Sequence, residues 1–355
     1  MNSAGTTEIL STHTPELFQT AVLHAARLLR AGNVVALPTE TVYGLAANAL
    51  DAKAVAQIYE IKGRPSHNPI IVHVSDLAMA KRCVSHWPAT ATRLASAFWP
   101  GPLTMVLPRS DAIPDIVTAG GDTVGVRWPS HPFIQAVVRE CDFPLAAPSA
   151  NLSNRLSPTN AAHVAAQLGD KLPFIVDGGQ SQVGIESTVV DLTSTPPRVL
   201  RPGMIHTESL EATLEMPVAD CRLPIAVAAL KSPGLLKKHY SPRAKLFVLS
   251  WRDTAALLAQ LSTLNIPPSR CGIIAHTTIP SDEQFGGVSV IPHDAEAFAR
   301  AIYSELHRCD EAAVEWIIVE SPPAAPEWEG IADRLRRASA EGMETRNLPI
   351  GREVC

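Results

Sequence analysis

Short apolar segments alternate with segments of helical periodicity along most of this 355-residue chain. Val34–Leu37 and Leu103–Leu107 have the length and composition of buried strands, and Glu16–Arg30 carries apolar residues at helical spacing. Two further strand-like segments, Thr188–Leu192 and Val199–Leu200, follow each other without a helical pattern between them. Because both kinds of connection occur, residues 1–204 predict a twisted, partly antiparallel sheet with helices packed on it, which is an α/β fold.

The alternation weakens from Met204 to about Ala244, where prolines at 217, 224, 233 and 242 interrupt the chain as they do in linkers. Strand-like and helical segments alternate again after this stretch, which predicts a smaller, parallel, Rossmann-like α/β domain. This part contains neither a GxGxxG nor a Walker A sequence, so it shows no nucleotide fingerprint. We therefore predict a first domain at 1–204, a linker at 205–244 and a C-terminal domain at 245–355.

Composition argues against several classes of protein. The formal net charge is −5 at pH 7, unlike that of a protein that coats nucleic acid with a generally basic surface. No run of about 18 apolar residues occurs, so we expect no membrane span. The first residues lack the basic and apolar regions of a secretory signal, and the six cysteines include no CxxC pair. We therefore expect a cytoplasmic protein with reduced thiols and no metal site.

The most informative polar residues lie between Pro38 and His73. The sequence PTETVYGLA at 38–46 follows a strand-like segment, and KGRPSHNPIIVH at 62–73 follows a helical one. The second sequence holds Lys62, Arg64, Asn68 and His73, which suit a small anionic ligand such as a nucleotide phosphate together with a carboxylate. Cations at a helix C-terminus are also favoured by the helix dipole alone, and a single histidine is often a buried core residue.

The turn after the first strand contains Thr39, Thr41 and Tyr43. These residues could contact a ligand, or they could simply belong to strands, where threonine and tyrosine are common. Glu40 in the same turn could bind magnesium, but we expect it to lie in solvent.

Thr123 and Arg127 occupy alternate positions of one predicted strand, so both side chains face the same side. Arg127 lies between Val126 and Trp128, and burying it without a partner would be costly. The sequence fits an internal carboxylate and an anionic ligand equally well as the partner of Arg127.

Three more segments carry polar groups at the ends of predicted elements. Ser149 and Asn151 form a turn that can cap the chain locally or present amides to a phosphate. Ser157 precedes a helix as an ordinary capping residue does, although free amides there also attract anions. Ser187 begins a strand and Arg201 ends the next one. Arg201 is the fourth cation beside a strand end, and the four together predict a polyanion cleft at one edge of a sheet.

Six sequences within residues 15–204 together resemble the YrdC-domain family of threonylcarbamoyl-adenylate synthases in its long, two-domain form. They are PTETVYGLA, KGRPSHNPIIVH, TVGVRWPSHP, PLAAPSANLS, GIESTVVD and LRPG. The sequence SPGLLKKHYSP at 232–242 is similar to the active-site loop that joins the two domains in that form. The resemblance implies that the first domain is catalytic, and we expect the second domain to anchor this loop over the nucleotide.

The resemblance also implies a reaction. L-Threonine, bicarbonate or CO2, and ATP accompanied by Mg2+ would give L-threonylcarbamoyladenylate and pyrophosphate. The product would supply a downstream tRNA threonylcarbamoyl transferase complex, which forms N6-threonylcarbamoyladenosine at position 37 of ANN-decoding tRNAs. Stable nucleic-acid binding by this chain itself is not expected. The alternative from another functional class is an RNA-binding module that uses a basic concave sheet.

Residue roles are carried over from the matching motifs. Lys62 and Arg64 match catalytic positions that also contact ATP. The positions that match threonine-binding residues are Thr41, His73, Arg127, Ala147 and Ser187. The further positions that match ATP-binding residues are Asn68, Thr123, Ser149, Asn151, Ser157, Arg201 and Tyr240.

Overall fold

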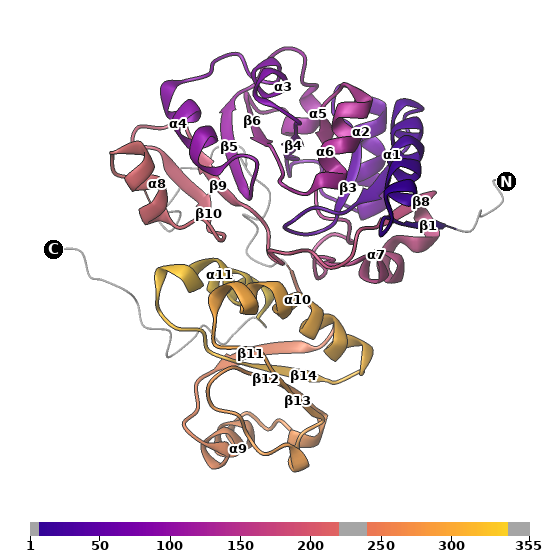
Figure 1. Ribbon diagram of the computed structural model, residues 1–355. Helices are drawn as coiled ribbons and strands as arrows, with labels where there is room; N and C mark the ends of the chain where they lie inside the picture. Colours follow the sequence, from indigo (N-terminus) through magenta and orange to yellow (C-terminus); the bar gives the residue numbers. More distant parts are fainter. Residues whose placement is uncertain (1–6, 220–239, 340–355) are drawn as a thin grey trace. The chain divides into compact units, whose positions relative to one another are not determined.

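The computed structural model describes residues 7–219 and 240–339 (Figure 1). The chain divides into two compact units. The first unit comprises Met1–Ser153 and Ser157–Leu236, and the second comprises Asn154–Leu156 and Lys237–Cys355. The short segment Asn154–Leu156 therefore belongs to the second unit, although the chain on both sides of it belongs to the first.

Ten strands of the first unit form one sheet: β1 (Glu8–Ser11), β2 (Val35–Leu37), β3 (Gly44–Asn48), β4 (Val72–His73), β5 (Leu103–Pro108), β6 (Thr123–Arg127), β7 (Leu145–Ala146), β8 (Phe174–Asp177), β9 (Thr188–Asp191) and β10 (Arg198–Arg201). Their order across the sheet is β1-β8-β2-β3-β7-β4-β6-β5-β9-β10. The pairs β1–β8, β2–β8, β4–β6 and β5–β9 are parallel, and the other neighbours are antiparallel. The prediction of a partly antiparallel sheet is confirmed.

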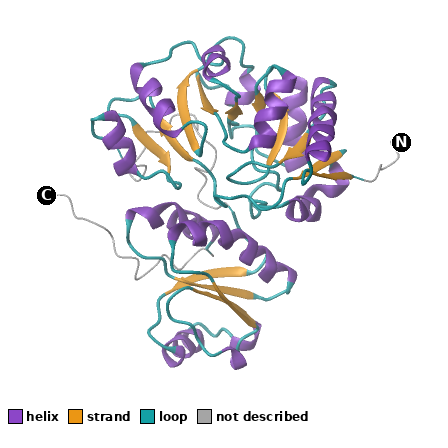
Figure 2. Cartoon of the chain, in the orientation of Figure 1, coloured by secondary structure: helices purple, strands orange, loops and turns teal. Residues whose placement is uncertain are grey.

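Helices pack on this sheet (Figures 1 and 2). They are α1 (Pro15–Arg30), α2 (Ala52–Lys62), α3 (Leu77–Arg82), α4 (Ala89–Phe98), α5 (Asp115–Thr118), α6 (Pro132–Cys141), α7 (Ala161–Leu168) and α8 (Thr207–Leu214). Helix α2 carries Lys62 at its C-terminal end. Its first turn is capped by the Asp51 side chain, which accepts hydrogen bonds from two backbone amides. It ends because Gly63 takes φ of 58°, a left-handed conformation that glycine adopts without a steric penalty, so Lys62 is the last helical residue.

Some elements differ from those that the sequence predicts. Only Val72–His73 of the predicted strand Pro69–Val74 is a strand. Before it, the Pro69 carbonyl accepts a hydrogen bond from Arg64 and the Ile70 amide donates to the Val117 carbonyl of α5, so neither group pairs with a strand. Helix α8 lies in the stretch predicted as linker from its prolines, and it packs against α4 through buried leucines such as Leu210. Residues 220–239 of that stretch lie outside the described residues, so the boundaries of the linker stay a prediction.

The second unit contains a separate parallel sheet. Its strands are β11 (Lys245–Leu249), β12 (Cys271–Ala275), β13 (Gly287–Val290) and β14 (Trp316–Glu320), and its helices are α9 (Thr254–Thr263), α10 (Ala295–Glu311) and α11 (Glu329–Ala338). The strand order is β11-β14-β12-β13, and every pairing is parallel. Helix α9 covers one face of the sheet, whereas α10 and α11 cover the other (Figure 1). The predicted parallel α/β domain is confirmed.

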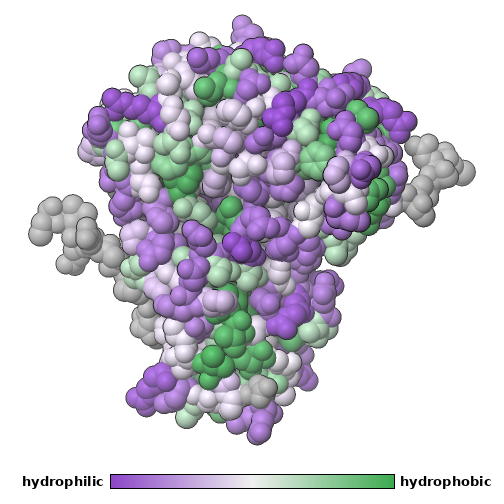
Figure 3. Space-filling model, viewed as in Figure 1, coloured by the Kyte–Doolittle hydropathy of each residue, from purple (hydrophilic) through white to green (hydrophobic). Residues whose placement is uncertain are grey.

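Most of the surface shown in Figure 3 is hydrophilic, with small separate hydrophobic patches. Exposed large hydrophobic side chains include Ile279 at 57% and Val290 at 54%, both in the second unit. Within the described residues, no helix combines the length and apolar character that crossing a membrane requires.

Close packing in the first unit predicts a cost for a methyl group at Gly203, the residue that comes after the Arg201–Pro202 pair. A Cβ atom at Gly203 would lie 2.5 Å from the Thr188 backbone nitrogen and 2.9 Å from the Glu186 carbonyl oxygen. Because backbone atoms must move to accommodate it, we expect Gly203→Ala to lower the free energy of unfolding by about 1–3 kcal/mol. Chemical denaturation measures the change.

Gly169→Ala is the matched control. Gly169 has φ of −55°, and a Cβ atom there would come no closer than 3.9 Å to Ala165 Cβ. We expect its free energy of unfolding to change by less than about 0.5 kcal/mol. Equal stabilities of the two variants would contradict the packing described at Gly203.

Candidate functional site

Lys62 is buried at the C-terminal end of α2, with 3% of its surface exposed. Its ammonium donates hydrogen bonds to the Ser149 carbonyl, to the Asn151 carbonyl and, at 3.1 Å, to Asn151 Oδ1. Burial, and then the charge of Arg64, lower the pKa of Lys62 well below its usual range. The fold thus brings Lys62 together with the predicted Ser-x-Asn turn, although that turn begins at Ser149, 87 positions further along the chain.

Arg64 organises the backbone that comes after it. Its Nε donates to the Asn68 carbonyl at 3.0 Å, and its Nη2 donates to the Pro69 carbonyl at 2.6 Å. The Asn68 side chain is only 1% exposed, and neither Oδ1 nor Nδ2 has a hydrogen-bond partner among the described residues. An unsatisfied buried amide is costly, so Asn68 indicates a polar ligand at this position.

Sheet register places four of the predicted site residues on one face of the first sheet. His73 lies opposite Arg127, and Thr104 lies opposite Val189, which in turn lies opposite Arg201. Directly opposite residues point to the same face, as do alternate residues of one strand. The opposite face carries Val72, Val124, Val126, Met105 and Val190, all members of the main hydrophobic core. The site residues on the first face are Thr104, His73, Thr123, Arg127 and Arg201.

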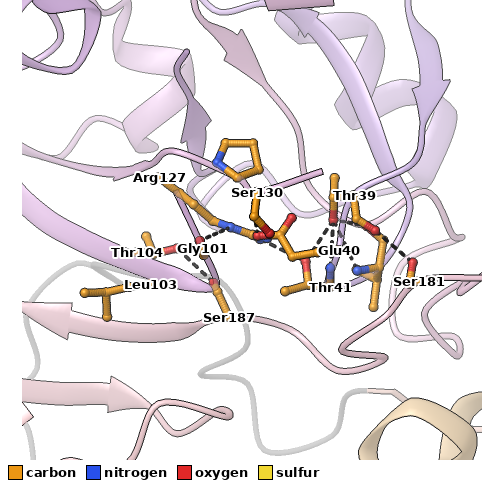
Figure 4. A network of polar contacts seen from close by, with 12 residues as sticks. Thr39, Glu40, Thr41, Gly101, Leu103, Thr104, Arg127, Ser130, Ser181 and Ser187 are labelled. Carbon is orange, nitrogen blue, oxygen red and sulfur yellow. Dashed lines mark hydrogen bonds and ion pairs between the residues drawn. The ribbon is translucent and has the colours of Figure 1, made fainter. Parts of the chain in front are cut away.

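Arg127 forms a buried ion pair with Glu40 (Figure 4). Arg127 Nη2 lies 2.7 Å from Glu40 Oε1, and the two side chains are 5% and 6% exposed. Arg127 also donates to Thr41 Oγ1 at 2.9 Å and to the Gly101 carbonyl at 3.3 Å. The expectation that Glu40 lies in solvent is therefore wrong, and the internal carboxylate considered for Arg127 is present. Nothing in the local sequence pairs these residues, because they are 87 positions apart.

The environment of Glu40 favours its charged form. Burial alone would raise the pKa of Glu40, but the Arg127 guanidinium and the Ser130 amide outweigh it and hold the pKa below its ordinary value. Thr39 keeps the same loop in place, since its hydroxyl donates to the Val42 carbonyl at 2.6 Å and lies 2.9 Å from Thr41 Oγ1. The loop after β2 is thereby tied to the end of β6.

His73 lies beside this ion pair and is 3% exposed. Its Nδ1 has no hydrogen-bond partner within residues 7–219 and 240–339. Burial, and then the Arg127 charge, lower the pKa of His73 to about 3, so its imidazole is neutral at physiological pH. Between about pH 6.5 and pH 3, the His73 imidazole binds a proton in the unfolded chain but not in the folded protein. His73 therefore lowers the free energy of unfolding as the pH falls through that interval.

Ser187 and Arg201 form a second polar group on the same face. Arg201 donates from Nε to the Ser187 carbonyl and from Nη2 to Ser187 Oγ, both at 3.0 Å. Ser187 Oγ also lies 2.8 Å from Thr104 Oγ1 (Figure 4). Thr104 is a site residue that we did not predict. The signal that could have identified it is the alternation of side chains along its strand, which places Thr104 on the same face as Arg127 of the neighbouring strand.

The four predicted cations do not lie at one edge of the sheet, which corrects the sequence prediction. Arg127 and Arg201 end strands that run in the same direction, so both lie at one edge. Lys62 and Arg64 instead bind carbonyls beside the opposite end of β4, at Ser149 and at Asn68 and Pro69. The two pairs of cations therefore lie at opposite ends of one face of the sheet. Arg64 binds the Asn68 carbonyl and Arg127 lies opposite His73, and Asn68 and His73 occupy opposite ends of one extended segment.

The other predicted residues lie at several places around these groups. Ala147 donates its amide to the Ile71 carbonyl at 3.1 Å, beside the same face. Thr123 begins β6, about 13 Å along the strand from Arg127. Ser157 is fully buried and donates to Glu186 Oε1 at 2.5 Å. Tyr240 belongs to the second unit, and residues 232–239 of its predicted loop lie outside the described residues.

The second sheet uses its own carboxylate at the edge where open parallel sheets commonly bind phosphate. Glu320 ends β14, and its carboxylate accepts hydrogen bonds from the backbone amides of His276, Thr277 and Thr278, which come directly after β12. Successive amides of this kind form an anion site. In this unit the chain supplies the anion itself.

Replacing Glu40 tests the buried ion pair. In Glu40→Gln, Arg127 has no carboxylate partner among the described residues, and we expect the free energy of unfolding at pH 7 to fall by about 3 kcal/mol. Ionised Glu40 adds to the free energy of unfolding above its ordinary pKa of 4.5. This contribution is lost as the pH falls through the lower pKa that Glu40 has in the folded protein. The difference between wild type and variant should therefore shrink in acid.

Glu140→Gln is the control, because Glu140 pairs with Arg30 on the surface at 3.2 Å. Its free energy of unfolding should change by less than about 1 kcal/mol. Urea denaturation of the three proteins at pH 7 and below pH 4 makes the comparison. A Glu40→Gln variant as stable as Glu140→Gln at pH 7 would show that the pair is dispensable.

Comparisons with known proteins agree along most of the chain. A family model described as "Telomere recombination" (Sua5/YciO/YrdC) matches residues 27–203, and one described as "Threonylcarbamoyl-AMP synthase, C-terminal domain" matches residues 205–340. The threonylcarbamoyl-AMP synthase of Pyrococcus abyssi is 38% identical over 89% of this chain and 93% of its own length. That of Bacillus subtilis is 39% identical over 94% and 95%. The crystal structure of P. abyssi Sua5 complexed with L-threonine matches with a TM-score of 0.85 and 35% identity, covering 94% of this chain and 98% of that one.

Proposed function

The chain belongs to the threonylcarbamoyl-AMP synthase family, whose members are transferases that form an adenylate, and on this premise we propose its substrates and the roles of its site. The substrates are L-threonine, bicarbonate or CO2, and ATP with its magnesium ion. The products are threonylcarbamoyl-AMP and pyrophosphate. Synthase relatives at 38–39% identity favour this enzyme over an RNA-binding module.

One observation carries the assignment of the site: two sets of polar groups lie at the two ends of one face. One end has Arg127 with the neutral imidazole of His73. The other has Lys62, Arg64 and the side-chain amide of Asn68, which has no hydrogen-bond partner in the described part of the chain. A cation for a carboxylate and a neutral hydrogen-bonding ring suit an amino acid, whereas two cations and an amide suit a nucleotide.

The first end is the proposed threonine site. Thr41 and Ser187 add hydroxyl groups there, and both side chains are 1% exposed. Glu40 and Thr41 fix the Arg127 guanidinium, so it is already oriented before a carboxylate arrives. Ala147 contributes a small side chain, which leaves room above the sheet.

The second end is the proposed ATP site. Lys62 and Arg64 lie near the phosphates, and Asn68, Thr123, Ser149, Asn151 and Ser157 are the further ATP contacts proposed here. Two more ATP contacts are proposed from the motif match alone: Arg201, which bonds Ser187 at the Arg127 end of the face, and Tyr240, which belongs to the second unit. Burial, and then the charge of Arg64, lower the pKa of Lys62 in the free protein, and a polyphosphate would favour its protonated form. Among the described residues, no cluster of His, Cys, Asp and Glu could hold a metal, which fits magnesium that arrives bound to ATP.

The chemistry needs two anions to meet. The threonine amine adds to the carbon of CO2 and loses a proton, which gives an N-carboxylate. An oxygen of this carboxylate attacks the α-phosphorus of ATP, and the bond from the α-phosphorus to the bridging oxygen of pyrophosphate breaks. Lys62 and Arg64 offset the repulsion during attack and the charge on the leaving pyrophosphate. Positioning and charge neutralisation therefore account for catalysis without a covalent intermediate on the protein.

The product also defines the proposed cellular role. A mixed anhydride of a carbamate and AMP is an activated acyl donor, and we expect a tRNA threonylcarbamoyl transferase complex in the cytoplasm to consume it. That complex would place the group on adenosine 37 of ANN-decoding tRNAs. The chain itself needs no stable contact with tRNA for this role.

Replacing Lys62 tests the catalytic assignment. We expect Lys62→Ala to lower pyrophosphate release at least about 100-fold, because the charge on both anions is then less well neutralised. Pyrophosphate is measured with threonine and bicarbonate present. Lys53→Ala is the control, since Lys53 is exposed at the other end of α2, and its turnover should equal that of wild type. Near-normal turnover by a folded Lys62→Ala variant would refute the role.

A ligand-dependent thermal shift tests the substrates. ATP and threonine together should raise the unfolding midpoint beyond the sum of their separate effects, because each fills one end of a shared face. Omission of bicarbonate should abolish pyrophosphate release. Strong stabilisation by RNA, with none from ATP and threonine, would favour the RNA-binding module instead.

A further inference from the structure

Arg334 of α11 is almost completely buried in the second unit, with 2% of its side chain exposed. Arginine is rarely buried to this extent unless a partner compensates its charge. Arg334 Nη1 lies 3.0 Å from the carboxylate of Asp333, which is equally buried. The Arg334 Cζ atom lies 5.4 Å from the centre of the Tyr240 ring. This distance is within the range of a cation–π contact.

Asp333 allows Arg334 to be buried. Burial alone would raise the pKa of Asp333, but Arg334, Arg337 and Arg336 outweigh it and lower the pKa, so the carboxylate stays ionised. Arg336 and Arg337 reach the same carboxylate at 2.5 and 2.9 Å. Arg336 differs from Arg334 in its surroundings, since its side chain is 52% exposed.

Tyr240 adopts a conformation that is unusual for an aromatic residue. Its φ is +61°, in the left-handed region that side chains other than those of glycine and asparagine seldom occupy. Its ring is 1% exposed and lies 6.1 Å from the Tyr303 ring of α10. Such backbone strain persists where surrounding contacts impose it, and Arg334 and Tyr303 supply contacts of this kind.

The residue after Tyr240 connects this arrangement to the candidate site along the chain. The Ser241 amide donates to the Asn154 carbonyl at 2.9 Å, and Arg155 and Ser241 form an isolated parallel bridge. Asn154 is three residues beyond Asn151, and Asn151 is one of the acceptors of the Lys62 ammonium. The segment that leaves the Lys62 site therefore pairs directly with the segment that holds Tyr240.

We propose that Arg334, held by Asp333, is a positioning residue that fixes Tyr240 and, through the Ser241–Asn154 pairing, the chain beyond Asn151. This inference rests on the proposed function, in which Tyr240 and Asn151 contact ATP. It gives the second unit a defined part in the reaction. Its proposed part is to fix the conformation of two segments that serve the nucleotide, one of which holds Tyr240.

The test compares Arg334→Gln with Arg336→Gln. Both substitutions remove a guanidinium that contacts Asp333, but only the first removes the cation over Tyr240. We expect Arg334→Gln to lower kcat/KM for ATP about tenfold, mainly through KM, because loss of a desolvated cation–π contact affects positioning and not the chemical step. Arg336→Gln should match wild type. Equal kinetics of the two variants would overturn the proposal.

A double-mutant cycle separates positioning from general stability. If Arg334 acts through Tyr240, adding Arg334→Gln to a Tyr240→Leu variant should cause little further loss in kcat/KM for ATP. Independent, multiplicative losses would overturn the proposal. If Arg334→Gln does not fold, Arg334→Lys replaces it in the same cycle, since lysine keeps the charge but loses the planar stacking group.

The proposed function and this inference can fail separately. Wild-type protein that releases no pyrophosphate with ATP, threonine and bicarbonate refutes the proposed function. ATP binding measured by calorimetry then still compares Arg334→Gln with Arg336→Gln, and equal dissociation constants would refute the positioning role by itself.

Discussion

The buried ion pair between Arg127 and Glu40 is the interaction on which the site in the first unit depends. Two charges with about 5% exposure are tolerated only when each compensates the other, so the loop after β2 has to lie against the end of β6. Thr41 completes this arrangement by accepting a hydrogen bond from the same guanidinium. Burial first, and then repulsion from the Arg127 guanidinium, lower the pKa of the neighbouring His73, so its imidazole is neutral, although Glu40 acts in the opposite direction.

The second requirement is small residues on the face of the sheet that carries the site. Gly125 lies between two site residues of β6, and a Cβ atom there would approach Thr104 to 3.2 Å and Ile71 to 3.4 Å. Ala147 is similarly small. The opposite face of these strands is filled by valines and other core residues, and the site face holds a smaller buried apolar cluster that includes Ile71, Val106 and Val189.

The two units satisfy their charged groups in different ways. In the first, backbone carbonyls accept from Lys62, while the Asn68 side chain has no partner among the described residues. In the second, Glu320 binds the amides at the carboxyl edge of the sheet, where a phosphate could otherwise bind. The fold of the second unit thus resembles a nucleotide-binding domain, whereas its chemistry supports positioning of Tyr240.

The sequence by itself determined the α/β class and the two sheets, and it led to the polar residues proposed for the site, because hydrophobic periodicity and short motifs are local properties. It did not determine that Glu40 pairs with Arg127, that Thr104 joins Ser187, or that Lys62 and Arg127 lie at opposite ends of one face. Those facts depend on strand register and on contacts between residues 80 or more positions apart. Only the tertiary structure decides them, since burial and pairing energies arise after distant segments meet.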